Sequence, residues 1–157
     1  EVRGTSPASE KRHGMLLSEA SYDDFTVRLK FKVDKGDSGF YWRAQPVDSV
    51  VSVNGSQVEV DSSFETGGLY ETGGRAWVVK PDPNYIEKQA KYQPGQWTDL
   101  AMVVEGTNTR VFLNGRETAR LTSDEKGNRE GHFGLQLHGS MDMDVSFKDL
   151  KILTKSK

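Results

Sequence analysis

The fold is decided by the stretch Phe25-Thr26-Val27-Arg28-Leu29-Lys30-Phe31-Lys32-Val33. Its odd-numbered positions are all apolar, and its even-numbered positions are threonine, arginine or lysine. Side chains of a β-strand alternate between the two faces of the sheet, so this stretch has one apolar face and one wet face. The pattern predicts an antiparallel strand that covers a core on one side only.

Short runs of the same kind fill the rest of the chain and are separated by turn residues. The pairs Gly106-Thr107 and Asn114-Gly115 predict two hairpins. We expect another turn at Asn54-Gly55, after a short strand over residues 50–53, and one helical turn near residues 85–91. About a dozen short strands without a long helix predict an all-β fold, a β-sandwich or jelly roll. No linker divides the chain, so residues 1–157 are expected to form a single domain.

Composition limits the possible functions. The chain has 157 residues, 21 basic and 23 acidic, with a formal net charge of −2, which does not favour nucleic acid or an anionic membrane as a partner. No apolar run reaches the ~18 residues needed to span a bilayer. The absence of cysteine excludes disulfides and thiolate metal sites. Because the chain starts at Glu1 without methionine or an apolar signal segment, we expect a mature or excised piece of a longer protein.

Two runs between Gly36 and Trp77 carry the candidate site. In the first, Tyr41 and Arg43 share the face opposite an aromatic pair. In the second, Gln57, Glu59 and Asp61 share the face opposite two valines. The apolar sets belong in the core, so the opposite sets are expected on one open sheet face. A face with aromatic, cationic, amide and acidic groups can hold a sugar.

Glu59 is the candidate general base. Gln57 and Asp61 lie on its face about 6–7 Å away, as expected for alternate residues of a strand. A second acid nearby raises the pKa of a carboxyl, so Asp61 would tune Glu59 or bind a hydroxyl group. Arg43 would hold an enolate oxygen or sugar hydroxyls. A structural ion pair of Arg43 with Glu59 or Asp61 is the alternative.

A third run adds His138 and Gln136 on one face. Histidine serves as an acid or a base because its unperturbed pKa is near 6.5. His132 is expected at the rim, and His13, in a polar loop, is expected to have no role.

Aromatic residues provide stacking surfaces for a sugar ring. Tyr41, Tyr70 and Trp77 are the candidates, and for Trp77 a place in the core is the favoured alternative. Trp42 and Trp97 are assigned to the core.

No cofactor is expected. Asp142 and Asp144 resemble a pair of oxygen ligands for calcium, but alternating acids are also common on a solvated strand. Three histidines without close spacing argue against zinc.

Seven motifs in sequence resemble the 3-keto-disaccharide hydrolase domain family, formerly a domain of unknown function, whose jelly roll is related to the concanavalin-like lectins and glucanases. The motifs are Ser38-Gly39-Phe40-Tyr41-Trp42-Arg43, Gly55-Ser56-Gln57-Val58-Glu59-Val60, Thr66-Gly67-Gly68-Leu69-Tyr70, Pro94-Gly95-Gln96-Trp97-Thr98-Asp99, Phe112-Leu113-Asn114-Gly115, Gly134-Leu135-Gln136-Leu137-His138-Gly139 and Val145-Ser146-Phe147-Lys148-Asp149-Leu150-Lys151-Ile152. The chain departs from the family pattern at Ser56, where an aromatic residue is usual.

The resemblance implies a saccharide partner and a site on the concave sheet. The substrate would be a glycoside already oxidised at C3, whose ketone acidifies the hydrogen on C2. A base removes that hydrogen, the group on C1 leaves, and water adds to the enone. The resemblance also implies a periplasmic or extracellular location. The sequence does not indicate the oligomeric state.

Two alternatives stay open. A non-catalytic carbohydrate-binding module, or lectin, uses the same kind of sheet face, because fold does not determine function. A retaining β-glucanase would carry a Glu-x-Asp-x-(x)-Glu motif, which Glu59-Val60-Asp61 begins, but the next acid, Glu65, is too far along the chain.

Overall fold

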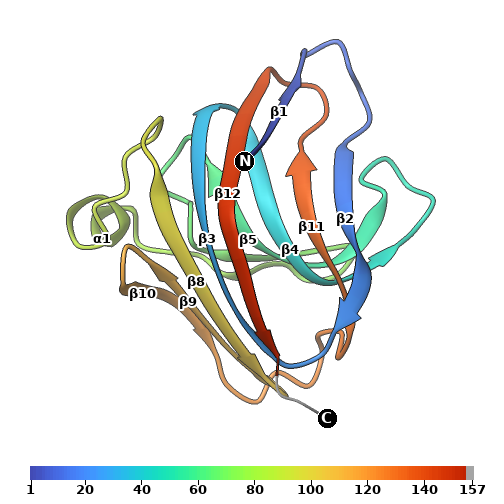
Figure 1. The fold of residues 1–157 in the computed structure, drawn as a ribbon, viewed down its shortest axis with the longest axis vertical. Helices are drawn as coiled ribbons and strands as arrows, with labels where there is room; N and C mark the ends of the chain where they lie inside the picture. Colours follow the sequence, from blue (N-terminus) through green and yellow to red (C-terminus); the bar gives the residue numbers. More distant parts are fainter. Residues whose placement is uncertain (155–157) are drawn as a thin grey trace.

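Two antiparallel sheets of six strands face each other (Figure 1). The computed structural model describes residues 1–154. The first sheet consists, in spatial order, of β1 (Val2–Ser6), β12 (Met143–Thr154), β3 (Phe25–Lys35), β8 (Thr98–Glu105), β9 (Asn108–Leu113) and β10 (Arg116–Leu121). The second consists of β2 (Gly14–Tyr22), β11 (Gly131–Leu137), β4 (Asp37–Pro46), β5 (Val53–Asp61), β6 (Leu69–Thr72) and β7 (Ala76–Val79). The predicted all-β sandwich is confirmed.

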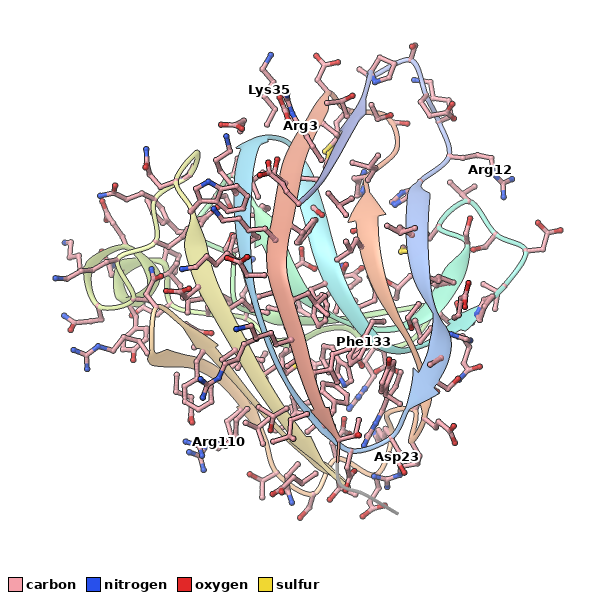
Figure 2. All side chains as sticks on the ribbon, viewed as in Figure 1. Arg3, Arg12, Asp23, Lys35, Arg110 and Phe133 are labelled. Carbon is pink, nitrogen blue, oxygen red and sulfur yellow. The ribbon has the colours of Figure 1, made fainter. Side chains whose placement is uncertain are left out.

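The core lies between the two sheets. All five apolar residues of β3 are buried, with at most 3% of any of them exposed, as the alternation predicted. The second sheet contributes Phe40, Val58 and Val60, which are fully buried in the same cluster. Phe133 of β11 lies in the interior, whereas Arg12 and Arg110 lie at the periphery (Figure 2). The opposite face of β4 and β5 is therefore left to form a surface of its own.

Two hairpins join β8, β9 and β10, as predicted. Asn114 and Gly115, between β9 and β10, both have positive φ, at 48° and 77°. Two left-handed residues in succession are typical of the tight turn that asparagine–glycine favours.

The predicted turn at Asn54-Gly55 is wrong, because both residues lie inside β5. Residues 50–52 are not a strand. A Cβ at Gly55 would lie 2.9 Å from Cα of Ala44. Glycine is therefore used here for close approach to β4 rather than for a turn.

The predicted helical turn is α1 (Pro83–Lys88), between β7 and β8. Asp82 caps it by accepting a hydrogen bond from the backbone nitrogen of Asn84. The structure reveals no helix within residues 1–154 with the length and apolar character that a membrane span requires.

Two tryptophans assigned to the core behave differently. Trp42 is 3% exposed, as expected. Trp97 is 36% exposed, and Lys148 Nζ lies 3.9 Å from its ring centroid. The core assignment of Trp97 is wrong because the next residue, Thr98, is the one that is buried.

We expect Phe31→Ala to lower the free energy of unfolding by about 3–5 kcal/mol, because removing a fully buried ring leaves a cavity between the sheets. Urea denaturation measures this loss. Arg28→Ala, at an exposed position of the same strand, is the matched control and should change the value by less than about 0.5 kcal/mol. Equal effects of the two substitutions would contradict the placement of the core.

Candidate functional site

A pocket of about 510 Å³ opens on the face of the second sheet that is turned away from the core. This volume lies within the usual range for small-molecule sites, roughly 300–1,000 Å³. Its walls come from β4 to β7, from the end of β11 and from several of the loops that connect the strands. The lining residues are His13, Asp37, Tyr41, Val51, Gln57, Glu59, Glu65, Tyr70, Thr72, Gly73, Trp77, Gln136 and His138.

Gly39 of β4 leaves room for two glutamine side chains beneath the pocket. Gly39 is paired with Glu59 across the ladder, and the side chains of Gln57 and Gln136 extend over it. A Cβ built on Gly39 would lie 1.9 Å from Gln57 Oε1 and 3.3 Å from Gln136 Oε1. Within residues 1–154, both of these amide oxygens are buried without a hydrogen-bond partner. Both oxygens thus face the backbone of Gly39 at the bottom of the pocket.

Glu59 lines this pocket as half of a carboxyl pair. It is 5% exposed, and its Oε1 accepts a hydrogen bond of 2.7 Å from Gln57 Nε2. Burial, with the negative charges of Asp37 and Asp61, raises the pKa of Glu59 to about 9. Burial and the charge of Asp61 raise the pKa of Asp37 to about 6, whereas His138 and a hydrogen bond with Glu59 lower it. Near neutral pH, Glu59 therefore holds a proton that it shares with Asp37.

Asp61 adjoins this pair but does not line the pocket. Its Oδ1 accepts hydrogen bonds from Ser63 N at 2.7 Å and from Thr66 Oγ1 at 2.9 Å. Its Oδ2 accepts one from Ser63 Oγ at 3.0 Å. The expected role as a hydroxyl ligand is corrected, because the carboxylate is occupied by the turn that follows β5. Its charge still acts on Asp37 and Glu59.

One oxygen from each of Asp37, Glu59 and Asp61 lies within 4.8 Å of the others. Such a group has the donor atoms that a hard cation prefers. These carboxyls can share a proton, as the raised pKa of Glu59 describes, and a cation bound there would displace that proton. Asp142 and Asp144, the pair that resembles calcium ligands, have other partners. Asp142 accepts a hydrogen bond from the backbone of Ala8, and Asp144 forms a bidentate ion pair with Arg3.

The imidazoles of His13 and His138 form a second wall of the pocket. The ring centroids of His13 and His138 are 4.1 Å apart, with 51° between the planes. His138 and Gln136 share the pocket, as predicted. His13 was expected to have no role, yet it lines the same wall. Its loop is held there by a hydrogen bond from His13 N to Val50 O.

Aromatic side chains form the third wall. Tyr70 and Trp77 meet edge to face, with centroids 5.7 Å apart. The core assignment of Trp77 is wrong, since this residue is only partly buried and lines the pocket. Tyr41 also lines the pocket but is fully buried, and its hydroxyl is 2.7 Å from Thr72 Oγ1. Tyr41 therefore supports the site from below and offers no stacking surface.

Arg43 lies outside this pocket, and the expectation that it shares the face of Tyr41 is wrong. The pairing of β4 with β5 shifts between Trp42 and Gln45, and Arg43 has φ of 49°. A bulge of this kind inserts one extra residue and interrupts the alternation of faces.

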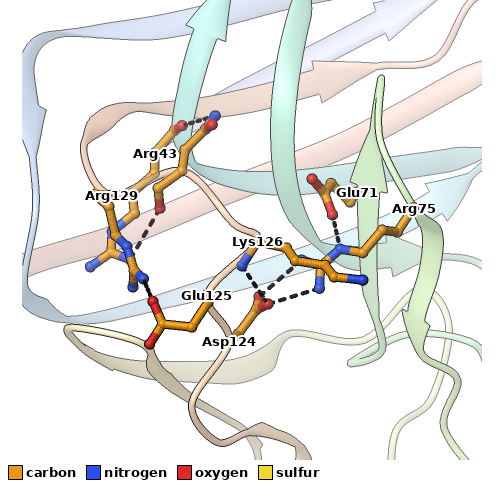
Figure 3. A network of polar contacts seen from close by, with 8 residues as sticks. Arg43, Glu71, Arg75, Asp124, Glu125, Lys126 and Arg129 are labelled. Atoms are coloured by element: carbon orange, nitrogen blue, oxygen red, sulfur yellow. Dashed lines mark hydrogen bonds and ion pairs between the residues drawn. The ribbon is translucent and has the colours of Figure 1, made fainter.

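The buried guanidinium of Arg43 instead ties three loops together. It donates to the backbone oxygens of Asp23, Gly106 and Asn128 and pairs with Asp24 at 3.2 Å. Figure 3 shows Arg43 beside the loop of residues 123–130, where Arg75 pairs with Asp124. Neither Glu59 nor Asp61 is its ion-pair partner.

The comparisons with known proteins decide the family. A family model described as "3-keto-alpha-glucoside-1,2-lyase-like domain" matches residues 2–153. The chain belongs to this family. No curated protein matches the sequence.

Solved structures share the fold of this family member at low sequence identity. A carbohydrate-binding module, CBM66 of Bacillus subtilis, is 17% identical with a TM-score of 0.66, over 97% of this chain and 95% of that one. A candidate glycosyl hydrolase of Parabacteroides distasonis is 16% identical with a TM-score of 0.69, over 96% and 89%. A Bacillus subtilis protein of unknown function with a galectin-like fold is 11% identical with a TM-score of 0.62, over 92% and 78%.

The buried proton on Glu59 predicts a pH dependence of stability. The folded chain keeps a proton that the unfolded chain releases above about pH 4.5, so the free energy of unfolding should fall as pH rises toward about 9. The slope from one group is at most about 1.4 kcal/mol per pH unit. Urea denaturation between about pH 7 and 9, above the titration of Asp37, measures it.

Glu59→Gln, a neutral substitute of similar shape, should remove most of this slope. Glu87→Gln, at an exposed position of α1, should keep it. A slope in Glu59→Gln as steep as in the original protein would show that Glu59 does not hold the proton.

Proposed function

We propose that the protein cleaves glycosides whose sugar ring carries a ketone at C3, by elimination across C1 and C2. The observation that carries this proposal is that a buried carboxyl, Glu59, lines the same pocket as the imidazole of His138. Burial and the neighbouring acids raise the pKa of Glu59 to about 9, so it can donate a proton, whereas His138 can accept one. Elimination needs this pair, one group to take the hydrogen from C2 and one to protonate the leaving oxygen.

His138 is proposed as the base. Its Nδ1 lies 2.7 Å from the backbone oxygen of Gly139. A carbonyl oxygen only accepts, so Nδ1 carries the hydrogen and the lone pair of the neutral ring is on Nε2. Nε2 takes the hydrogen from C2, and the electron pair of that C–H bond forms an enolate between C2 and the C3 oxygen. When the enolate returns to a ketone, the pair forms the C1–C2 double bond and the C1–O bond breaks.

Glu59 is proposed as the acid. The sequence suggested the opposite role, but a carboxyl with a pKa near 9 is protonated at neutral pH and can donate. As the C1–O bond breaks, the leaving oxygen takes the proton of Glu59 and departs as an alcohol. Asp37 shares that proton and completes the pair. Addition of water to the enone would complete net hydrolysis.

Gln57 and Gln136 are proposed to contact the sugar, since both line the pocket, and Tyr70 and Trp77 are proposed to contact the ring. The family description supports this substrate class, since it names a lyase of 3-keto-α-glucosides. A periplasmic or extracellular location remains a proposal from the family resemblance.

A second candidate is a non-catalytic carbohydrate-binding module. It is favoured by the aromatic wall of Tyr70 and Trp77 and by the similarity to CBM66 over nearly the whole chain. Binding of a saccharide without cleavage is the result that this candidate predicts.

The deciding experiment compares sucrose-like and trehalose-like disaccharides with and without oxidation at C3. We expect cleavage of the oxidised forms only, followed by the ultraviolet absorbance of the enone and by release of the second sugar. Glu59→Gln and His138→Ala should each lower kcat by about 100-fold or more.

His132→Ala is the matched control, because His132 does not line the pocket and its Nδ1 contacts Ser18 O. It should retain the original rate. Full activity in both site variants would refute the assigned roles. Saccharide binding with no cleavage of any oxidised glycoside would establish the binding module instead.

A further inference from the structure

We propose that His13 binds the C3 carbonyl oxygen of the substrate and donates a hydrogen bond from Nε2 to the enolate that forms there, with Gln136 as the residue that fixes this proton position. The inference rests on the proposed function and adds the third group that elimination requires. The enolate oxygen needs a hydrogen-bond donor. Arg43, the donor suggested by the sequence, lies outside the pocket.

The contact between His13 and Gln136 defines which ring nitrogen carries the hydrogen. Gln136 Nε2 lies 2.9 Å from His13 Nδ1. An amide nitrogen only donates, so Nδ1 accepts and the hydrogen of the neutral ring is on Nε2. Because Gln136 occupies Nδ1, Nε2–H is the ring's free polar group for a ligand in the pocket that His13 lines.

Gln136 is held in this orientation by its neighbours. It is 3% exposed, and its Nε2 also lies 3.4 Å from Tyr41 Oη. That hydroxyl is in turn 2.7 Å from Thr72 Oγ1. Polar contacts thus run from Thr72 of β6 through Tyr41 of β4 and Gln136 of β11 to the imidazole of His13.

The loop that carries His13 is packed closely enough to position it. Ser140 N donates to Glu10 O at 2.6 Å, and a Cβ at Gly139 would lie 2.5 Å from Lys11 O. His13 N is itself bonded to Val50 O. Backbone contacts therefore hold the loop at Glu10, at Lys11 and at His13 itself.

His13 and His138 consequently present opposite groups from adjacent rings. His138 has its hydrogen on Nδ1 and a lone pair on Nε2, whereas His13 has a lone pair on Nδ1 and a hydrogen on Nε2. The rings are 4.1 Å apart. In a 3-keto-glycoside, the carbonyl oxygen that needs a donor is on the carbon next to the one whose hydrogen needs an acceptor. His13 supplies the donor for the carbonyl oxygen, and His138 supplies the acceptor for the hydrogen on the neighbouring carbon.

His13 is also kept neutral. Burial lowers its pKa, and the positive charge that His138 gains on protonation lowers it further. A neutral imidazole that donates one hydrogen bond can polarise a substrate carbonyl. It does so without giving up its proton to the base beside it.

Proton positions are tested first, by long-range ¹H–¹⁵N spectra of the ¹⁵N-histidine-labelled protein at neutral pH. We expect His13 protonated on Nε2 and His138 on Nδ1. Gln136→Glu places an acceptor against His13 Nδ1 and should move the His13 proton to that nitrogen. A wild-type spectrum with His13 protonated on Nδ1 would overturn the proposal without any activity measurement.

Kinetics on an oxidised disaccharide form the second test. His13→Ala should lower kcat about 100- to 1,000-fold, the usual effect of removing one donor to an oxyanion, with little change in KM. His13→Gln, which retains an amide donor, should recover part of this loss, and His132→Ala should have no effect. Gln136→Glu should lose kcat together with the altered proton position.

The outcomes separate this inference from the function it rests on. If the wild-type protein cleaves oxidised disaccharides and His13→Ala is equally fast, the role of His13 is refuted and the proposed function stands. If the wild-type protein cleaves none of them, the proposed function fails and the carbonyl role of His13 fails with it.

Discussion

The packing of Val58 and Val60 into the core determines what the rest of the second sheet can do. Both valines are fully buried between the sheets. The pleat then places Gln57 and Glu59 on the other side of β5, together with Tyr41 of the neighbouring strand. The polar face is therefore a direct consequence of the apolar one, and a shift in register would remove core and site together.

Burial on that face sets the chemistry of its acids. A carboxylate in a poorly solvated position is unfavourable, and a second carboxylate close by makes it more so. Asp37 and Glu59 reduce this cost by sharing a proton. Asp37 and Glu59 thus hold a shared proton at the wall of the pocket.

Alternation along single strands was sufficient to predict part of the site. It placed Gln57 and Glu59 on one face of β5, and Gln136 on the matching face of β11. The signal for these residues is local, because a buried apolar set on one side determines what lies on the other.

The prediction failed where the geometry depends on distant parts of the chain. Arg43 does not lie on the pocket face because β4 contains a bulge, and the residues of that strand do not predict the bulge. Asp37 follows Gly36, a pair that is typical of a turn, yet it is the first residue of β4 and lines the pocket. His13 reaches the site through loop contacts with Val50 and with residues after β11, at separations that periodicity does not cover.

Gly39 determines how the glutamine side chains beneath the pocket are arranged. The space above it is bounded by the flexible ends of two glutamine side chains rather than by backbone. A substitution to alanine or serine would displace the Gln57 amide and leave the strand ladder in place. The position of the Gln57 amide beneath a ligand therefore depends on the absence of a side chain at one residue of the neighbouring strand.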